Sequence, residues 1–261
     1  MSLFEFELLP VDEIVPWGEE PNLTLSWFAL TDGRFRMRVG AQTLFEYSDQ
    51  IGSLWKIERL NAEFQIAAFA RDMLGCFSAA VTPLPTLIER VASDDALMNE
   101  LQITEPDEGQ HDKALSQDYA AWRWLGERSP WTSYLVAEPR IHFLRIGNDV
   151  RICWDNRSRK VDELPVWTAE HGFHTMSVDQ FSQECTDFRD RLLDAMACRI
   201  GEIESGIVAP RIPVNVASLR DQHEDWEKEF LTYFGSYKPD ISWLEAESAL
   251  RAIAQKKGIH L

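Results

Sequence analysis

The chain has 261 residues, and its 26 Lys and Arg against 43 Asp and Glu give a formal net charge of −17. A composition of 45% hydrophobic and 26% charged residues is typical of a folded globular protein and excludes a disordered or fibrous one. The length accommodates one large domain or two modest ones. Because so acidic a surface is repelled by phosphate backbones and by anionic bilayers, direct binding to nucleic acid or to a membrane is disfavoured.

The N-terminal residues differ from a secretory leader. Residues 1–7 hold acidic side chains where a signal peptide has a basic region followed by an apolar run. No segment approaches the ~18 consecutive apolar residues of a membrane-spanning helix. The four cysteines, Cys76, Cys153, Cys185 and Cys198, form no C-x-x-C pair and have no histidine at zinc-finger spacing. We therefore expect a cytoplasmic protein with reduced, mostly buried thiols.

The first fifty residues predict β-strands. Apolar and acidic residues alternate over residues 3–8, and residues 34–39 alternate with a strict period of two. Residues 23–30 are a mixed apolar run, and the Asp-Gly pair in residues 31–33 predicts a turn that joins this run to residues 34–39 as a hairpin. A fourth strand at residues 43–47 extends the hairpin into a meander.

The hydrophobic period then changes to that of a helix. Residues 57–77 carry apolar side chains on most of the helical circumference, which predicts a helix buried on several sides. Pro83 and Pro85 end this region, and a short helix is expected at residues 86–92.

An acidic segment follows at residues 93–113, and it contains no Lys or Arg before Lys113. Its turn-forming composition predicts a linker or a long exposed loop. We place a boundary here, between an N-terminal subdomain at residues 1–115 and a C-terminal subdomain at residues 116–261. The alternative is that both parts form one compact domain.

The second part repeats the order of strands before helices. A helical segment at residues 119–125 precedes two strands, residues 140–146 and 150–154, which flank a predicted three-residue loop, Gly147-Asn148-Asp149. Further strands are plausible at residues 166–168 and 173–176.

Three helices are predicted in the last third of the chain. A capping box, Ser177 with Gln180, introduces a long amphipathic helix that reaches Ile203. Two more helices are predicted at residues 218–234 and 242–257, the second with its own capping box and with Gly258 as its end. The predicted fold class is therefore α+β: antiparallel sheets, an N-terminal meander and a central hairpin, packed with segregated amphipathic helices.

The sequence lacks the local motifs of the common catalytic classes. It has no Walker phosphate loop, no dinucleotide-binding glycine pattern, no H-E-x-x-H and no nucleophile elbow. His171 and His174 form the only close histidine pair, but on a strand they point to opposite faces, and no carboxylate or thiol stands beside them. We therefore predict no catalytic residue, no metal and no cofactor, although a site assembled from distant residues leaves no such trace.

Two groups of basic residues and a set of tryptophans are candidates for a functional surface. Arg34, Arg36 and Arg38 share one face of their strand, which suits an anion-binding surface or a solvated face that pairs with acids. Residues 140–160 hold six basic and two acidic side chains, a positive island in an acidic protein. Most of the ten tryptophans are expected in the core, and exposure is most plausible for the group Trp122, Trp124 and Trp131.

Several strings point to a family. These are Pro16-Trp17-Gly18, the LSWFxLTDG string at residues 25–33, Arg38-Val39-Gly40, Trp154-Asp155-Asn156-Arg157 and Pro165-Val166-Trp167-Thr168. They resemble a bacterial family of uncharacterised proteins that is catalogued only as a domain of unknown function. The resemblance implies a bacterial cytoplasmic origin and supplies no catalytic residues.

Two hypotheses of different classes follow, beside an unassigned scaffold or defence-system role. The first is a binding protein, most plausibly a bacterial immunity protein that neutralises a basic cognate toxin domain by stoichiometric binding. Its partner-binding residues are predicted in the acidic segment: Asp94, Asp95, Glu100, Glu105, Asp107, Glu108 and Asp112. The alternative is an enzyme or ligand-binding domain whose site is built from separated residues, with Arg34, Arg36, Arg38, Asp155 and Arg157 as its lining. The sequence does not specify the oligomeric state.

Overall fold

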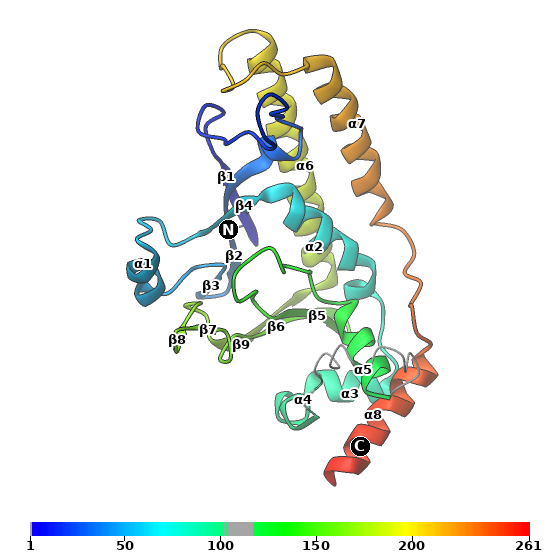
Figure 1. The fold of residues 1–261 in the computed structure, drawn as a ribbon. Helices are drawn as coiled ribbons and strands as arrows, with labels where there is room; N and C mark the ends of the chain where they lie inside the picture. The colour runs from blue at the N-terminus through cyan, green and yellow to red at the C-terminus, as the bar shows by residue number, and fades with distance from the viewer. Residues whose placement is uncertain (1, 102, 104–116) are drawn as a thin grey trace.

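The computed structural model describes residues 2–101, 103 and 117–261, which form two larger antiparallel sheets and one two-stranded sheet, with helices packed around them (Figure 1). This confirms the predicted α+β class. No helix in the described part of the chain is both long and apolar enough to cross a membrane.

The first sheet is organised around the strand β2 (Asp32–Val39). β1 (Phe4–Leu8) pairs along one edge of β2, and β3 (Gln42–Leu44) and β4 (Ala62–Gln65) share the other edge. Alternate residues of β2 are buried, so the period-two prediction for this strand is confirmed.

The predicted hairpin before β2 is wrong. Residues 23–30 form no ladder with β2, and Ala29–Thr31 is a short 3-10 helix. The reason is a competing contact with the helix α7 (Val216–Thr232): Trp27 N–H donates to Gln222 Oε1 over 2.9 Å, and the Trp27 ring stacks on Trp226 with centroids 5.1 Å apart. The Asp-Gly pair, read as a turn, instead begins β2.

Two helices of the first part differ from the prediction. A short helix not predicted from the sequence, α1 (Asp49–Trp55), begins at Ser48, whose hydroxyl caps its first turn. α2 (Ile66–Val81) begins later than expected because residues 62–65 extend as β4, with Ala62 and Phe64 buried at a period of two. The remainder of α2 is buried on several sides, as its sequence indicates.

The second sheet is an antiparallel meander of β5 (Ile141–Ile146), β6 (Asp149–Asp155) and β9 (His171–Ser177). Ile146 pairs with Asp149, so the β5–β6 turn contains two residues instead of the predicted three. The short strands β7 (Lys160–Val161) and β8 (Leu164–Pro165) pair separately.

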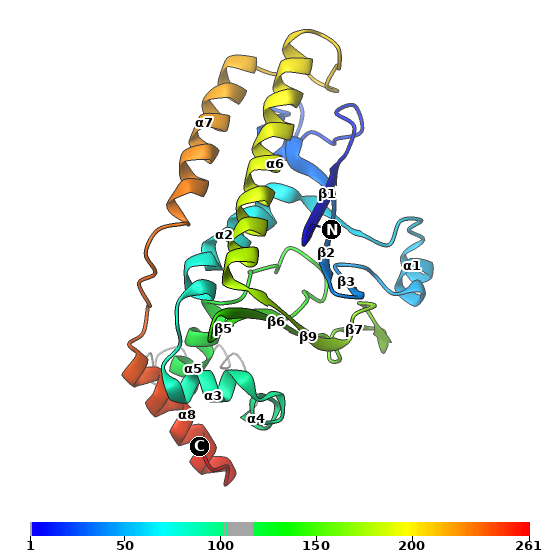
Figure 2. The same ribbon diagram turned by 180° about the vertical axis from the view of Figure 1, so that it is seen from behind.

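Helices cover both faces of the second sheet. The long helix α6 (Val178–Glu204) and α2 cover one face (Figure 2). On this face the rings of Phe143 and Phe181 meet with centroids 5.4 Å apart. The other face is covered by α3 (Thr86–Ser93), α4 (Asp95–Leu101), α5 (Gln117–Gly126) and α8 (Trp243–Lys257).

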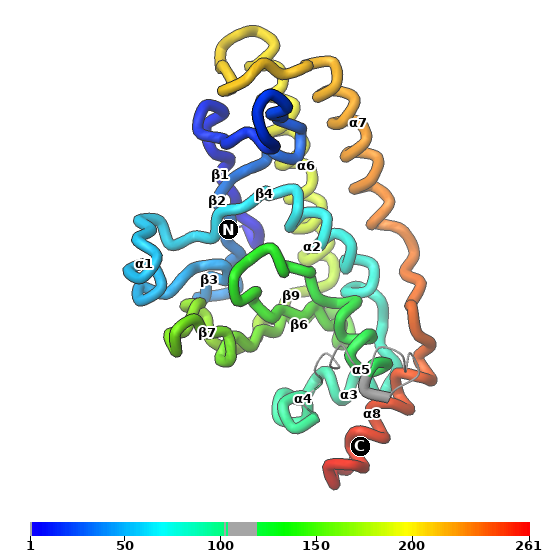
Figure 3. Tube along the Cα trace, viewed as in Figure 1, coloured from blue at the N-terminus to red at the C-terminus, as the bar shows by residue number. Residues whose placement is uncertain are grey.

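Both predicted capping boxes are present, at Ser177 with Gln180 and at Ser242 with Glu245. Gly258 ends α8 in the left-handed conformation, with φ of 69°. Figure 3 shows residues 233–242 as the extended connection that carries the chain from α7 to α8 at the opposite end of the molecule.

Residues from both sides of position 115 share the two hydrophobic cores. The first core combines β1, β2 and α2 with β5, β6 and α6, and the second combines α3 and α4 with α5 and α8. The acidic segment was predicted to be a loop or linker, but its described part contains the helix α4, which places Leu101 in the second core. Because Leu101 is the one buried residue of α4, the sequence of this helix shows no helical period of apolar residues.

Candidate functional site

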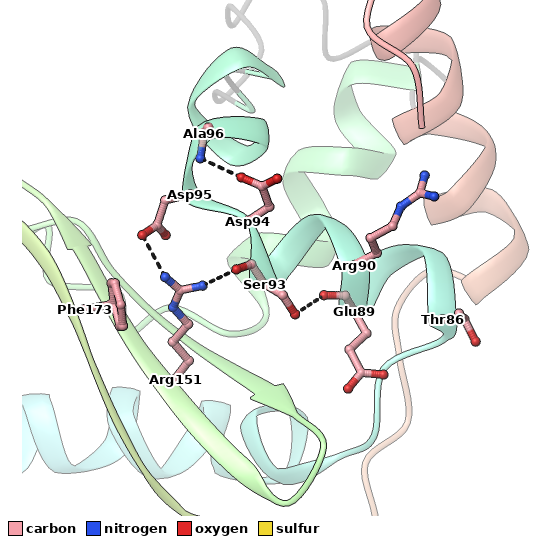
Figure 4. Close-up of a pocket in the computed structure, with 9 residues that line it drawn as sticks. All are labelled: Thr86, Glu89, Arg90, Ser93, Asp94, Asp95, Ala96, Arg151 and Phe173. Carbon is pink, nitrogen blue, oxygen red and sulfur yellow. Dashed lines mark hydrogen bonds and ion pairs between the residues drawn. The ribbon is translucent and has the colours of Figure 1, made fainter.

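Two adjoining hollows lie where α3, α4 and α8 meet the second sheet. We call the first the outer pocket: it is shallow, has a volume of about 880 Å³, and is lined by Thr86, Glu89, Arg90, Ser93, Asp94, Asp95, Ala96, Arg151 and Phe173 (Figure 4). The second, which we call the inner cleft, has a volume of about 1090 Å³ and extends between the sheet and the helices α4, α5 and α8. Asp95 and Phe173 line both, so the two hollows are neighbours.

Arg151 of β6 holds the sheet against the junction of α3 and α4. Its side chain is 7% exposed, and its guanidinium donates to the Ser93 carbonyl and to Asp95 Oδ2, each over 2.7 Å (Figure 4). It also lies over the Phe173 ring, 3.9 Å from the centroid. Phe173 is nevertheless 53% exposed, which leaves a fixed aromatic surface between the two hollows.

Three carboxylates of the outer pocket are each fixed through one oxygen. Asp94 Oδ1 caps α4 by accepting from the N–H groups of Ala96 and Leu97 over 2.9 and 3.1 Å. Glu89 Oε1 accepts from Gly147 N–H over 2.7 Å, and Asp95 Oδ2 accepts from Arg151. Within the described residues the second oxygen of each carboxylate accepts no hydrogen bond. The pocket therefore presents three immobilised anionic acceptors.

The floor of the inner cleft consists of two rows of side chains across the second sheet. The strand register aligns His142, Cys153 and Phe173 in one row. It pairs Asp155 with His171 in the next row, where Asp155 N–H also donates to the carbonyl of Arg140 over 3.2 Å. All six residues line the cleft, because residues two apart on a strand share a face.

His142 and Cys153 are both held in their neutral forms. Burial, together with the neighbouring charge of Arg140, lowers the pKa of His142 to about 4. The Ser129 hydroxyl donates to the Leu125 carbonyl over 3.0 Å, and it therefore accepts from His142 Nδ1–H. Burial raises the pKa of the Cys153 thiol to about 12, so this thiol is not a thiolate nucleophile at neutral pH.

The cleft carries more positive than negative charge, although the protein is strongly acidic. Its lining contains the cations Arg140, Arg157 and Lys257 and the carboxylates Asp95 and Asp155. Arg157 binds Asp155 through two hydrogen bonds, Nε to Oδ1 over 2.9 Å and Nη2 to Oδ2 over 2.6 Å, and this pairing lowers the pKa of Asp155. Lys257 donates to the carbonyls of Glu100 and Leu101 over 3.3 and 2.9 Å.

Three of the seven acidic residues predicted to bind a partner lie among the described residues. Asp94 and Asp95 line the outer pocket, and Glu100 lies on α4 beside a further hollow that Asp94, Lys257 and His260 also line. Glu105, Asp107, Glu108 and Asp112 lie outside the described residues. The predicted residues that the structure describes thus lie on α4 or at its N-terminus.

The arginines of the alternative site are distributed over two sheets. On β2, Arg34 pairs with Glu63 over 3.2 Å, and Arg36 and Arg38 both pair with Glu5. Asp155 and Arg157 instead lie at the inner cleft of the second sheet. The β2 arginines therefore form the acid-paired sheet face that was one of their two interpretations.

The two histidines of the close pair occupy opposite faces of β9. His171 lines the inner cleft, whereas His174 lies beside Gly40 of the first sheet's turn. Among the described residues no group of three or more His, Cys, Asp or Glu side chains is arranged to hold a metal ion. Of the suspected tryptophans, Trp131 is 71% exposed, whereas Trp124 is buried in the second core.

Sequence reasoning did not identify His142 or Phe173 as site residues, and it included Arg140 and Arg151 only as members of the basic island at residues 140–160. A period of two along residues 140–144 places Arg140 and His142 on one face, which was the available signal. No local pattern brings Arg151 to Ser93 and Asp95, because that contact joins segments 56 residues apart or more.

A family model matches residues 3–249, which include both sheets and nearly all of the lining of both hollows. The chain belongs to DUF5984, a family of unknown function. The match confirms the resemblance to an uncharacterised family. No curated protein and no solved structure matches this DUF5984 chain. Its function must therefore be argued from its own site.

Proposed function

We propose that this DUF5984 protein binds a basic protein and blocks its action, in the manner of an immunity protein that neutralises a cognate toxin domain. The observation that carries the proposal is the outer pocket, where Glu89, Asp94 and Asp95 each hold one oxygen fixed and one oxygen free. Through their free oxygens, immobilised carboxylates accept charge-assisted hydrogen bonds from an arginine or a lysine with little loss of side-chain entropy.

The shape of the pocket favours a protein side chain over a small molecule. The pocket is wide and shallow, and the exposed ring of Phe173 lies at its edge with carboxylates around it. An aromatic anchor within a polar rim is the usual anatomy of a protein–protein hot spot. A Lys- or Arg-rich loop fits this arrangement because its aliphatic stems pack on the ring while its charged ends reach the carboxylates.

The charge of the whole chain supports the same partner class. A net charge of −17 attracts a cationic protein over distance and raises the rate of association at low salt. We place the encounter in the cytoplasm, a location supported by the free thiols of all four cysteines.

The test begins with the product of the gene adjacent to this one in its host. Purified together, the two proteins should form a complex of defined stoichiometry whose association rate falls as salt rises, and the complex should lack the toxicity of the partner alone. Failure of every basic neighbour to bind would count against the proposal.

A matched pair of variants locates the interface. Glu89→Gln, Asp94→Asn and Glu100→Gln together remove three charges around α4 and leave the pair of Asp95 with Arg151 intact. We expect this variant to bind at least about tenfold more weakly, equal to about 1.4 kcal/mol. The control removes three charges from the exposed face of α7, through Glu224→Gln, Asp225→Asn and Glu227→Gln. Equal losses in both variants would show that only net charge matters and would overturn the assignment to the outer pocket.

A further inference from the structure

The inner cleft contains a cation that forms no ion pair with a carboxylate of the described residues. Arg140 is half-buried and lines the cleft, yet no carboxylate of the described residues lies within ion-pair distance of its guanidinium. Its neighbour Asp155 is hydrogen-bonded to Arg157, although the charge of Arg140 also helps to lower the pKa of Asp155. The charge of Arg140 lowers the pKa values of His142 and Arg159 as well.

The helices that face the sheet contribute apolar side chains beside polar ones. α4 contributes Met98 and Leu101 together with Asp95 and Asn99, and α8 contributes Ile253 together with Lys257. The volume of about 1090 Å³ is slightly above the usual range for small-molecule sites. The apolar side chains of the helices together with the guanidinium of Arg140 match a molecule with an anionic head and a hydrocarbon or aromatic body.

We propose that the inner cleft is a binding site for a small organic anion, a carboxylate or a phosphate monoester, whose head group is bound by Arg140 and whose apolar body packs against α4 and α8. A guanidinium binds both head groups through two parallel hydrogen bonds. Neutral His142 adds no positive charge but lines the same floor, where its ring is fixed by Ser129. The inner cleft shares Asp95 and Phe173 with the outer pocket, but Arg140 lines only the inner cleft, and the anion site does not depend on the proposed protein partner.

Simple amphiphiles provide the test. Octanoate and octyl phosphate share one tail and carry anionic heads, whereas octylamine carries a cationic head. Isothermal titration calorimetry on the whole protein should show saturable binding of at least one anion and none of octylamine. The ranking of the two anions then identifies the head group. Equal binding of octylamine, or no binding of either anion, would overturn the proposal.

Two variants assign the binding to the cleft. Arg140→Gln should weaken anion binding at least about tenfold, whereas Arg251→Gln, which removes a cation of α8 outside the inner cleft, should leave it unchanged. Asn99→Trp places a bulky ring at the cleft from an exposed position of α4 and should also reduce binding without affecting the core. Thermal melting of each variant verifies folding. If Arg140→Gln and Arg251→Gln bind the anion equally, or if Asn99→Trp binds as the unaltered chain does, the cleft is not the site.

Discussion

The guanidinium of Arg151 and the carboxylate of Asp95 meet over 2.7 Å, and this contact joins α4 to the second sheet between the two hollows. The two partners are not equivalent. Arg151 is nearly buried, whereas half of the Asp95 side chain is exposed to solvent. The arginine also binds the Ser93 carbonyl and stacks on Phe173, so it holds three segments together.

This asymmetry predicts unequal effects of removing either partner. Arg151→Met should lower the free energy of unfolding by about 2 kcal/mol, because it leaves the Ser93 carbonyl and Asp95 without their donor. Asp95→Asn should cost less than about 1 kcal/mol, because a half-exposed ion pair is screened by water. Urea unfolding of both variants measures the difference. A loss for Asp95→Asn as large as that for Arg151→Met would contradict this account of the contact.

His142 predicts a dependence of stability on pH. Its pKa is about 4 in the folded chain and near 6.5 when unfolded, so between these values the unfolded state binds the proton and the folded state does not. The contribution of His142 to stability is therefore complete above about pH 6.5 and is lost as the pH falls toward 4. Comparison of the chain with a His142→Gln variant isolates this effect. Between pH 7 and pH 5, the free energy of unfolding of the variant should fall by less than that of the unaltered chain.

The Arg140→Gln variant tests the cause of that shift. Removing the neighbouring positive charge should raise the pKa of His142 but leave it below 6.5, because burial is the larger cause. Imidazole NMR resonances followed through a pH titration report this value directly. An unchanged His142 pKa in Arg140→Gln would show that the arginine charge does not reach the ring.

Asp72 predicts a pH dependence of stability with the opposite sign to that of His142. Burial raises the pKa of its carboxyl to about 6, against a partial compensation by Arg71. Between the unfolded value of 3.8 and about 6 the folded state binds the proton more tightly, so this group favours folding at low pH and opposes it above pH 6. Asp72→Asn should therefore raise stability at pH 8 by about 1–2 kcal/mol after allowance for solvent screening. It should have little effect at pH 4, and guanidinium unfolding at the two pH values measures the contrast.

The parts of the fold that the sequence predicted correctly depend on local patterns. The alternation of β2, the two capping boxes and Gly258 each involve residues a few positions apart, so they are legible without tertiary contacts. The mixed apolar run at residues 23–30 was wrongly predicted to be a strand, because nothing in its local pattern reports the distant contact that sets its conformation. Its conformation is set by contacts of Trp27 with α7, almost two hundred residues away.

For the candidate site, too, the sequence predicted features that depend on local patterns and missed those that depend on distant contacts. The acidic character of α4 was visible in the sequence, and Asp94 and Asp95 were named from it. What the sequence could not provide is the packing of α4 over the second sheet, because this depends on one buried leucine and on Arg151. Arg140 was part of a recognised basic island, but the absence of an ion pair to Arg140 among the described residues depends on distances in the folded chain.

For the buried Arg128, we predict that the conservative substitution by Lys lowers stability more than substitution by the apolar Met. This side chain is fully buried, and the rings of Trp124, Tyr237 and Trp243 surround its guanidinium at 5.2 to 5.5 Å, which attaches α5 to the connection before α8. Its Nη1 donates to the Trp124 carbonyl over 2.9 Å, but its Nε and Nη2 have no partner among the described residues. Arg128→Met keeps the apolar stem and removes the unpaired donors, so we expect a loss below about 2 kcal/mol.

Arg128→Lys should be the more damaging substitution, because an ammonium lacks the planar guanidinium that packs among the three rings and is costlier to bury. We expect its loss of stability to exceed that of Arg128→Met by at least about 1 kcal/mol. Limited proteolysis provides a local readout, since release of the aromatic rings should expose residues 233–242 to cleavage more in Arg128→Lys than in Arg128→Met. If the lysine variant is as stable as the unaltered chain, the charge alone suffices, and the stacked planar geometry has no role in holding α8 to α5.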